Sequence, residues 1–595
     1  PHLGPKYLAE KLKAIKGENN GDELSESRYI YRLKRHIIQE SIYGVDIDAS
    51  AIDIARLRLW LSLVVDEDDF EPIETLPNLD YKIVCGNSLI GLPESAMRSL
   101  EVEKELEGLK QQFYNETNEQ EKKQLRTRIN TKIRELLDSA EQFAGYKIDF
   151  DFKLFFSEVW HEKKGFDVVI GNPPWLALIG KQMQKYKKVD ESKNLKVYKE
   201  QYIFNSYMPN LYEFFLQKGH RILSDFGNLT LIIPDRFGFN DSSFDLRKFF
   251  VDNSKLIEIV YKWNFPQIVT ETMTFICKKE IPKTNYSFRI RNNKDSVNIT
   301  HYFDELKKDD ELIFRNYQSV EIKELISLIN KNSENLIKYS KSTSGFGAKA
   351  DTITSERVYK NQMEVLKGSS IKPFVILKPF FFEFIDSNLG GRTRDEDKLS
   401  KNPKTCIRKT GYPIICSYDD SGRYPEQSLY FFYDLNNKIS DKFLLLYFNS
   451  ELANFYYKHY LGTNLESMPQ LKNKDLDRFP IRLPNSIEYY NILADYLLIA
   501  HKKNYSNIVI SFYNSLSSSL ILELALSEKF ISNKKEIFRH LGDLKPITDS
   551  MSDEEKLAVI QSEFERLYDP NHPVRNNLET LDSIEEVRII KEALK

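Results

Sequence analysis

Three short apolar runs, each ending in polar residues, constrain the fold of this chain more than any other feature. The runs are SIYGVDID (residues 41–48), DYKIVCGNSL (80–89) and FDVVIGNPPW (166–175). Their apolar cores have the length and composition of buried strands, and helical patterns lie between them. Strands that alternate with helices predict a parallel α/β sheet of Rossmann-like type. In such sheets ligands bind at the edge formed by the carboxyl ends of the strands.

The end of the third run is rigid and rich in hydrogen-bond acceptors. Pro173 and Pro174 cannot continue a β ladder, and they favour an extended conformation at Asn172. The Asn172 side chain and the carbonyl of Pro173 offer acceptors, and Trp175 adds a flat aromatic surface. Two acceptors beside an aromatic plate suit a planar ring that carries an amino group. The alternative is a tight turn with a buried Trp, and the residues alone favour neither.

The first two runs end in groups that suit a nucleoside. Asp46 and Asp48 follow the first strand, where a carboxylate can accept hydrogen bonds from ribose hydroxyls. Asp48 is also a good N-cap for the next helix, so both roles can hold, with Asp46 taking the ribose. Ile47 can lie against an adenine face. Asn87, followed by Ser88 in the second polar loop, can pair with an adenine edge.

Size and composition bound the possible classes of protein. The 595 residues are 41% hydrophobic, enough for about three domains. No apolar run approaches the ~20 residues of a membrane span, and no signal-peptide pattern follows Pro1, so no membrane partner is expected. The four scattered cysteines imply neither a disulfide framework nor a zinc site and fit a reducing cytoplasm. With a net charge of −3, any nucleic-acid-binding surface must be local.

The composition and residue patterns divide the chain into three parts, which predicts three domains. Residues 1–285 carry the three runs and contain a Lys/Glu-rich insertion at about 94–144 with helical spacing, predicted to form two long antiparallel helices. Residues 286–486 are predicted to form an α+β domain, and residues 487–595 a helical region. Residues 367–409 contain ten Lys and Arg but only five Asp and Glu, and phenylalanines are interleaved among them. This excess predicts a nucleic-acid reader, or an ordinary core with a charged rim.

Several of these segments together resemble a known family. GVDIDASAIDIARLRLWLSL, IVCGNSLIG and FDVVIGNPPW resemble, in this order, the second, third and fourth motifs of gamma-class adenine-N6 DNA methyltransferases. The likeness is greatest to type IIG restriction–modification methylases and the related BREX phage-defence methylases. LYEFFLQKGHRIL, GNLTLIIPDRF and NFPQIVTETMTFI resemble later motifs of that family. LKGSSIKPFVI, KTCIRKTGYPIICSYDDSGRYPEQSLYFF and LLLYFNSELANFYY resemble its TaqI-type specificity (target-recognition) domain.

The resemblance implies S-adenosylmethionine as cofactor and double-stranded DNA as partner, with the target adenine flipped out of the duplex. It implies that Asn172 and the carbonyl of Pro173 accept hydrogen bonds from the N6 amino group and that Trp175 and Phe265 enclose the base. The implied catalytic set is Asn172, Pro173, Pro174, Trp175 and Phe265. The implied cofactor-binding set is Asp46 for the ribose, Ile47 for the adenine face and Asn87 for the adenine amine, together with Ser88. The family often has Asp where this chain has Asn87.

One motif of the family is missing. A Gly-rich loop of the DPACGSG kind should precede the GVDID strand, because only glycine lets the backbone approach the cofactor so closely. Residues 1–21 have scattered glycines and no preceding strand. We therefore expect a methyltransferase sheet that is incomplete at its N-terminus, in a truncated chain that by itself binds the cofactor weakly and is nearly inactive. A nuclease, fused upstream or separate, is a further expected partner.

The sequence thus predicts a site-specific DNA adenine-N6 methyltransferase of a restriction–modification or phage-defence system. One alternative is a non-catalytic DNA-binding specificity subunit with a degenerate methyltransferase fold, which the missing Gly-rich loop and Asn87 favour. A second alternative is a methyltransferase that acts on RNA or protein, since related NPP motifs occur there.

Overall fold

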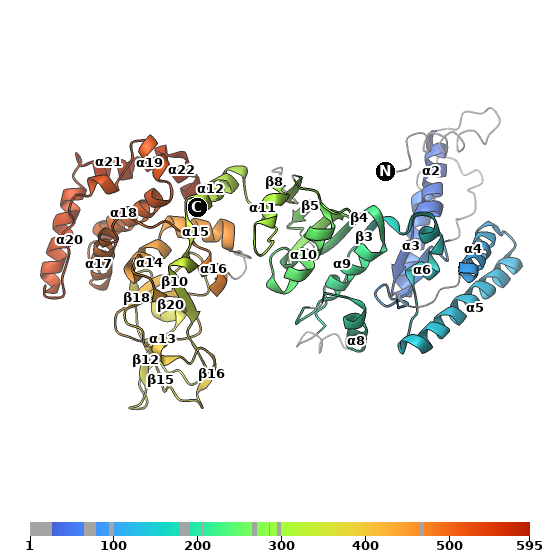
Figure 1. Cartoon of the computed structure of the whole chain (residues 1–595), viewed down its shortest axis with the longest axis horizontal. Helices are drawn as coiled ribbons and strands as arrows, with labels where there is room; N and C mark the ends of the chain where they lie inside the picture. Colours follow the sequence, from blue (N-terminus) through green and yellow to red (C-terminus); the bar gives the residue numbers. More distant parts are fainter. Residues whose placement is uncertain are drawn as a thin grey trace. The chain divides into compact units, whose positions relative to one another are not determined.

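The structure is a computed structural model in which the chain forms two compact units, Pro1–Asn316 and Tyr317–Lys595. The structure describes residues 26–64, 79–93, 100–178, 191–204, 206–263, 271–284, 286–293, 299–462 and 469–595. Figure 1 labels the helices and strands of both units. The three-domain division remains a prediction.

A small parallel sheet opens the first unit. Its elements are α2 (Glu26–Ser41), β1 (Gly44–Asp46), α3 (Ala49–Val64) and β2 (Ile83–Cys85). The two strands pair in parallel, with Asp46 opposite Cys85. Arg56 of α3 donates to the carbonyl of Ile83 at 2.6 Å and pairs with Asp80 at 3.2 Å. These contacts fix α3 against the strand that follows it.

A helical hairpin follows, within the range predicted to be helical. It consists of α4 (Leu100–Asn115) and α5 (Glu119–Ala144), with the short helices α6 (Phe152–Phe155) and α7 (Ser157–Lys163) after it. Asn118 caps α5, because its side-chain oxygen accepts from the N–H of Gln120 at 2.9 Å. Most charged residues of the hairpin face solvent, but Lys110 is only 2% exposed and donates to the carbonyl of Phe155. Burial lowers the pKa of this lysine.

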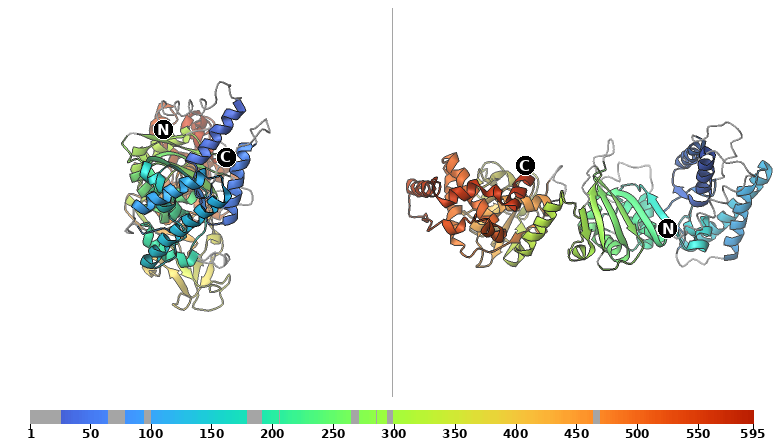
Figure 2. Two further views of the ribbon diagram at one scale, coloured as in Figure 1. Left: turned by 90° about the vertical axis from the view of Figure 1, so that its right-hand side faces the viewer. Right: turned by 90° about the horizontal axis from the view of Figure 1, so that it is seen from above.

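A six-stranded sheet with the order β3-β4-β6-β5-β7-β8 forms the rest of the first unit, and Figure 2 shows its strands side by side. The strands are β3 (Phe166–Gly171), β4 (Leu223–Pro234), β5 (Lys255–Tyr261), β6 (Thr272–Lys278), β7 (Ser287–Asn292) and β8 (Ile299–Tyr302). The pairs β3–β4 and β5–β7 are parallel, whereas β6 and β8 run antiparallel to their neighbours. The fold is therefore α/β as predicted, but this sheet is mixed rather than parallel throughout. The reason is that β6 follows β5 without a crossover helix among the described residues and inserts between β4 and β5.

Helices pack on this sheet and complete its core. They are α9 (Leu211–Ile222), α10 (Phe244–Asn253) and α11 (Phe303–Lys307), with one-turn helices η1 (Asp235–Gly238) and η2 (Asp241–Ser243). The helix α8 (Glu191–Gln201) instead packs into the core of the helical hairpin through Tyr198. Leu216 of α9 and Phe250 of α10 are fully buried against the strands. Arg247 is also fully buried, and its guanidinium donates to the carbonyls of Phe237 and Asn240.

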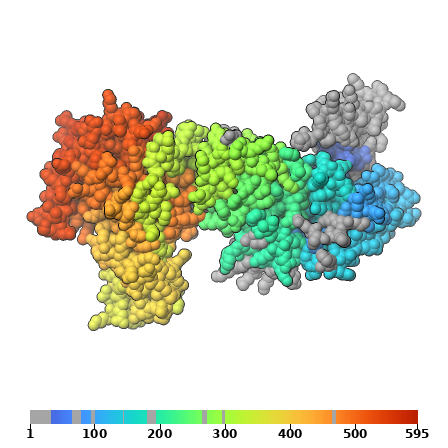
Figure 3. All heavy atoms as spheres, viewed as in Figure 1, coloured from blue at the N-terminus to red at the C-terminus, as the bar shows by residue number. Residues whose placement is uncertain are grey.

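The second unit begins with α12 (Val320–Lys331) and a β-rich part. Its largest sheet is antiparallel, in the order β10 (Ser340–Ser344), β20 (Leu429–Leu435), β17 (Lys404–Arg408) and β18 (Cys416–Asp419). Smaller sheets join β15 (Phe380–Phe382), β12 (Met363–Leu366) and β19 (Tyr424–Pro425); β11 (Phe346–Ala348) and β16 (Leu389–Arg392); β13 (Ile371–Lys372) and β14 (Val375–Ile376); and β21 (Pro480–Ile481) and β9 (Glu334–Asn335). Short helices are η3 (Leu336–Lys338), η4 (Gly368–Ser370) and α13 (Glu396–Leu399). The strands β12, β15 and β16 project from the helical body of this unit, as Figure 3 shows in yellow.

The remaining helices share one core with the four-stranded sheet. They are α14 (Asp441–Phe448), α15 (Glu451–Tyr456), η5 (Tyr457–Leu461), α16 (Asn473–Asp477), α17 (Glu488–Lys502), α18 (Asn507–Ala525), α19 (Ser527–Ser532), η6 (Phe538–His540), α20 (Asp553–Leu567), α21 (Pro573–Glu579), η7 (Leu581–Ser583) and α22 (Glu585–Leu594). A single cluster runs from Ile322 to Ile590, so the last hundred residues are packed into this unit. By length and composition alone α18 could cross a membrane, but 61% of it is buried in the protein.

Candidate active site

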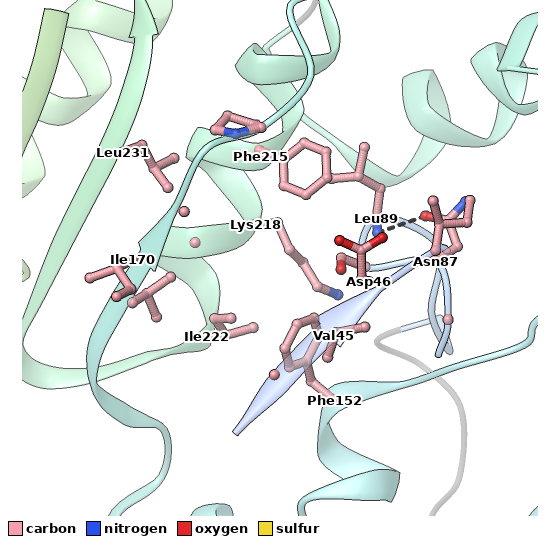
Figure 4. Close-up of a pocket in the computed structure, with 18 of the residues that line it drawn as sticks. Val45, Asp46, Asn87, Leu89, Phe152, Ile170, Phe215, Lys218, Ile222 and Leu231 are labelled. Carbon is pink, nitrogen blue, oxygen red and sulfur yellow. Dashed lines mark hydrogen bonds between the residues drawn. The ribbon is translucent and has the colours of Figure 1, made fainter. Parts of the chain in front are cut away.

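One cavity of the first unit collects the carboxyl ends of β1, β2 and β3. Its volume is about 480 Å³, within the range of small-molecule sites. Figure 4 shows the side chains that line it. Seven of the nine predicted site residues lie on its wall: Asp46, Ile47, Asn87, Ser88, Asn172, Pro173 and Pro174. Parallel strands place their carboxyl ends at one edge, so groups far apart in sequence meet here.

The two carboxylates after β1 have different environments. The N–H of Asp48 donates to Oδ1 of Asp46 at 2.9 Å. Asp48 in turn caps α3, since its Oδ1 accepts from the N–H of Ser50 at 2.8 Å and its carbonyl accepts from that of Ile52 at 3.2 Å. Only Asp46 lines the cavity. Its second carboxylate oxygen accepts no hydrogen bond from the part of the chain that the structure describes.

The loop after β2 holds Asn87 in a fixed orientation. Its amide oxygen accepts from the N–H of Leu89 at 2.9 Å and from that of Ile90 at 3.3 Å. Both lone pairs of that oxygen are therefore used, and the NH₂ group remains as a donor. The preceding Gly86 donates to the carbonyl of Asp46 at 2.8 Å. A Cβ at Gly86 would lie 2.3 Å from the Cβ of Phe150, so this close approach needs glycine.

The NPPW segment continues from β3 along the cavity and then leaves it. Asn172 and Pro174 are exposed, and Pro173 is buried. Trp175 is half-buried, packs against the core of the six-stranded sheet and donates from Nε1 to the carbonyl of Ile232 at 3.3 Å. It is not among the residues that line the cavity. Phe265, the predicted second aromatic wall, lies outside the residues that the structure describes.

Sequence reasoning missed a cation in this cavity, Lys218 of α9. Its ammonium lies 5.2 Å from the centre of the Phe152 ring. Figure 4 shows the side chain extending from α9 toward β1, where Asp46 lies. Nothing in the pattern LYEFFLQKGHRI separates this lysine from a surface lysine, because its position depends on how α9 crosses the sheet.

The strands that border the cavity each have an unpaired edge. β1 pairs only with β2, and β3 pairs only with β4, among the described residues. Val168 and Ile170 of β3 are 56% and 75% exposed, although the strand has the composition of one buried on both faces. On α3 an apolar stripe is also uncovered, with 44–53% exposure at Ile54, Leu57 and Leu61. Among the described residues, the two-stranded and the six-stranded sheet therefore do not pair with each other where the cavity lies.

Solved structures give weak overall similarity. The type ISP restriction–modification enzyme LlaBIII bound to DNA aligns with a TM-score of 0.41 and 11% identity, covering 84% of this chain and 36% of that one. The type IIL restriction–modification enzyme MmeI in complex with DNA aligns with a TM-score of 0.38 and 10% identity, covering 73% and 63%.

Sequence comparisons are more specific. A Methanocaldococcus jannaschii protein named as a type II restriction enzyme and methyltransferase is 24% identical over 573 residues, 79% of this chain and 47% of the relative. The type II restriction enzyme and methyltransferase RM.Eco57I of Escherichia coli is 25% identical over 270 residues, 44% of this chain and 21% of the relative. The chain thus spans less than half the length of these relatives.

Two family matches cover the regions that carry the motifs. Residues 40–267 match the Eco57I restriction-modification methylase family, and residues 363–481 match the TaqI-like C-terminal specificity domain. The first match contains all three strand ends of the cavity. The second contains the projecting β-rich part of the second unit. The chain therefore carries an Eco57I-type restriction–modification methylase domain followed by a TaqI-like specificity domain.

Proposed function

We propose that this chain is the methyl-transferring and sequence-reading part of a site-specific DNA adenine-N6 methyltransferase. The observation that carries the proposal is the meeting of Asp46, Asn87 and Asn172 in one cavity, at the edge where α/β sheets bind ligands. The partner is double-stranded DNA, in a restriction–modification or phage-defence system of the cytoplasm. A nuclease, fused or separate, is part of the same proposal.

The residues at β1 and β2 fit S-adenosylmethionine, which supplies an electrophilic methyl group when bound. The free carboxylate oxygen of Asp46 suits ribose hydroxyls, and Ile47, 63% exposed, offers an apolar surface to the adenine. Because the amide oxygen of Asn87 is already occupied, we assign this residue as a donor to a ring nitrogen. Ser88 lies beside it. Lys218 adds a positive charge to the same cavity, which suits the carboxylate of the cofactor.

The residues after β3 act on the target base. Asn172 Oδ1 and the carbonyl of Pro173 accept the two amino hydrogens of the flipped adenine. This keeps the lone pair of N6 out of conjugation with the ring and available for attack. Pro174 holds the loop rigid, and Trp175, anchored to Ile232, presents a ring for stacking. Phe265 is proposed as the opposite wall.

We further propose that one more parallel strand, with the Gly-rich loop at its end, completes the sheet between β1 and β3. Three observations support this: the two unpaired edges, the cavity between them, and the exposed apolar residues Val168 and Ile170. A strand flanked by a helix would cover these residues and the stripe on α3.

Methyl transfer to duplex DNA by the full-length protein tests the proposal. We expect Asn172→Ala to lower the rate at least 100-fold, by analogy with the loss of one transition-state hydrogen bond. Asn253→Ala is the matched control, since Asn253 is an exposed asparagine of the same unit whose side chain, among the described residues, hydrogen-bonds only to the Phe249 carbonyl. Full methylation by the Asn172 variant would contradict the mechanism.

The lack of pairing between the two sheets, among the described residues, also favours a second candidate, a non-catalytic DNA-binding specificity subunit. In that case the full-length protein binds duplex DNA equally well with and without cofactor in a gel-mobility shift assay, and it transfers no methyl group. Substrate competition distinguishes a methyltransferase that acts on RNA or protein. For such an enzyme, added duplex DNA would not inhibit methyl transfer to the RNA or protein substrate.

A further inference from the structure

The specificity domain contains a buried lysine without a carboxylate partner. Lys409 follows β17 and is 8% exposed. Its ammonium donates to the Ser344 hydroxyl at 2.6 Å and lies 4.4 Å from the centre of the Tyr430 ring. The nearby Glu426 accepts instead from the N–H and hydroxyl of Ser428, at 2.9 and 2.5 Å. No carboxylate among the described residues forms an ion pair with Lys409.

A second lysine at the other end of β17 shows how this domain neutralises a buried charge. Lys404 is fully buried, donates to the carbonyls of Leu399 and Lys401, and lies 3.7 Å from the Asp419 carboxylate. Lys409 has one acceptor for its three N–H groups. Because a buried charge without partners costs free energy, the remaining N–H groups indicate a place for an acceptor from outside the chain.

A second cation lies on the strand pair next to Lys409: Arg392 of β16 is paired with Phe346 of β11, two residues after the Ser344 that Lys409 contacts. Arg392 ends β16 with a positive φ of 64°, is exposed, and makes no side-chain hydrogen bond or ion pair with the part of the chain described. Burial and the charge of Arg392 lower the pKa of Lys409 to about 8. Gly390 and Gly391 precede Arg392, and a Cβ added at Gly391 would meet no heavy atom within 4 Å, so this part of β16 borders open space. Neither cation has an ion-pair partner among the described residues, and the Glu426 carboxylate near Lys409 is hydrogen-bonded to Ser428.

We propose that Lys409 and Arg392 together bind one backbone phosphate of the DNA duplex. This inference rests on the proposed function, in which the domain reads DNA. A phosphate supplies several acceptors, which suits both an ammonium with unused N–H groups and the forked guanidinium. The negative charge also offsets the repulsion between the two cations. Such a contact sets the position of the domain on the duplex and carries no sequence information itself.

The salt dependence of duplex binding by the whole chain tests this site. Each phosphate contact contributes about 0.9 to the slope of log K against log salt concentration. We expect Lys409→Met and Arg392→Gln each to lower the slope by up to about 0.9, and the double variant by no more than about 0.9, because the phosphate is shared. Lys341→Gln is the control, since Lys341 on β10 already pairs with Asp434 at 2.9 Å. DNA binding by this variant should have the same salt dependence as binding by the wild type.

Each contrary result is distinct. Wild-type slopes in both variants overturn the phosphate site, as does a double-variant loss of about 1.8, which would mean two separate phosphates. A changed base preference with an unchanged slope would assign the pair to base reading instead. If the wild-type chain binds no DNA, the site is overturned, whereas the methyl-transfer assay decides the proposed function separately. Met keeps the volume of a buried lysine, and Arg392 is exposed, so thermal unfolding should show both variants folded.

Discussion

The two carboxylates after β1 offer the sharpest test of the cofactor site. In the wild type, the N–H of Asp48 donates to Oδ1 of Asp46 at 2.9 Å. Asp46→Asn keeps an oxygen that can accept this hydrogen bond, so the strand end should stay in place. It replaces the free carboxylate oxygen by an NH₂ group, which donates and cannot accept from a ribose hydroxyl. A hydrogen bond to a charged group contributes about 1.5–3 kcal/mol. At about 1.4 kcal/mol per tenfold change, we expect cofactor binding to weaken about 10- to 150-fold.

Asp48→Asn is the matched control. Asp48 caps α3 through Ser50, and Asn is an equally good N-cap, so folding and cofactor binding should both stay near wild type. The assay is a calorimetric titration of S-adenosylmethionine into each variant of the full-length protein. Thermal unfolding of the same variants checks that they are folded. Equal losses in both variants, or a larger loss for Asp48→Asn, would refute the assignment of Asp46 to the ribose.

Two further changes test the packing and electrostatics of the first unit. Gly86→Ala should destabilise the protein by roughly 1–3 kcal/mol in urea unfolding, because the new Cβ would lie 2.3 Å from that of Phe150. Gly108→Ala in α4, with nothing within 4 Å, should instead stabilise it by roughly 0.5–1 kcal/mol, and a loss at both sites would contradict this reasoning. Burial and Glu271 raise the pKa of Asp235 to about 7, so its contribution to stability is lost as the pH rises from about 4 to 7. Asp235→Asn should therefore gain about 2–3 kcal/mol relative to the wild type between pH 5 and pH 8, and parallel stability–pH curves would disprove the shift.

Much of the cavity was predictable because the relevant signals are local. An apolar run followed by a polar loop identifies a buried strand and its functional end, and this pattern occurs at Asp46, at Asn87 and at Asn172. Parallel strands share one carboxyl edge, which predicts that Asp46 and Asn87 lie close together. Asn172 belongs to a second sheet, and the packing of the two sheets brings it to the same cavity. The sequence also predicted Asp48 as the N-cap of the next helix, and the hydrogen bond from the N–H of Ser50 confirms this cap.

Other features depend on contacts between distant segments, which no local pattern encodes. Lys218 enters the cavity because of how α9 lies across β3 and β4. Lys409 donates to Ser344, and the nearby Glu426 accepts from Ser428, so the two charges form no ion pair although they are only 17 residues apart in the sequence. The sequence by itself determined the strands, their polar ends and the order of the motifs, because each is encoded in a few neighbouring residues. The tertiary structure alone decided which side chains share a cavity with them and, among the described residues, where the two sheets do not pair and which charges have no partner, because these depend on packing between segments far apart in the chain.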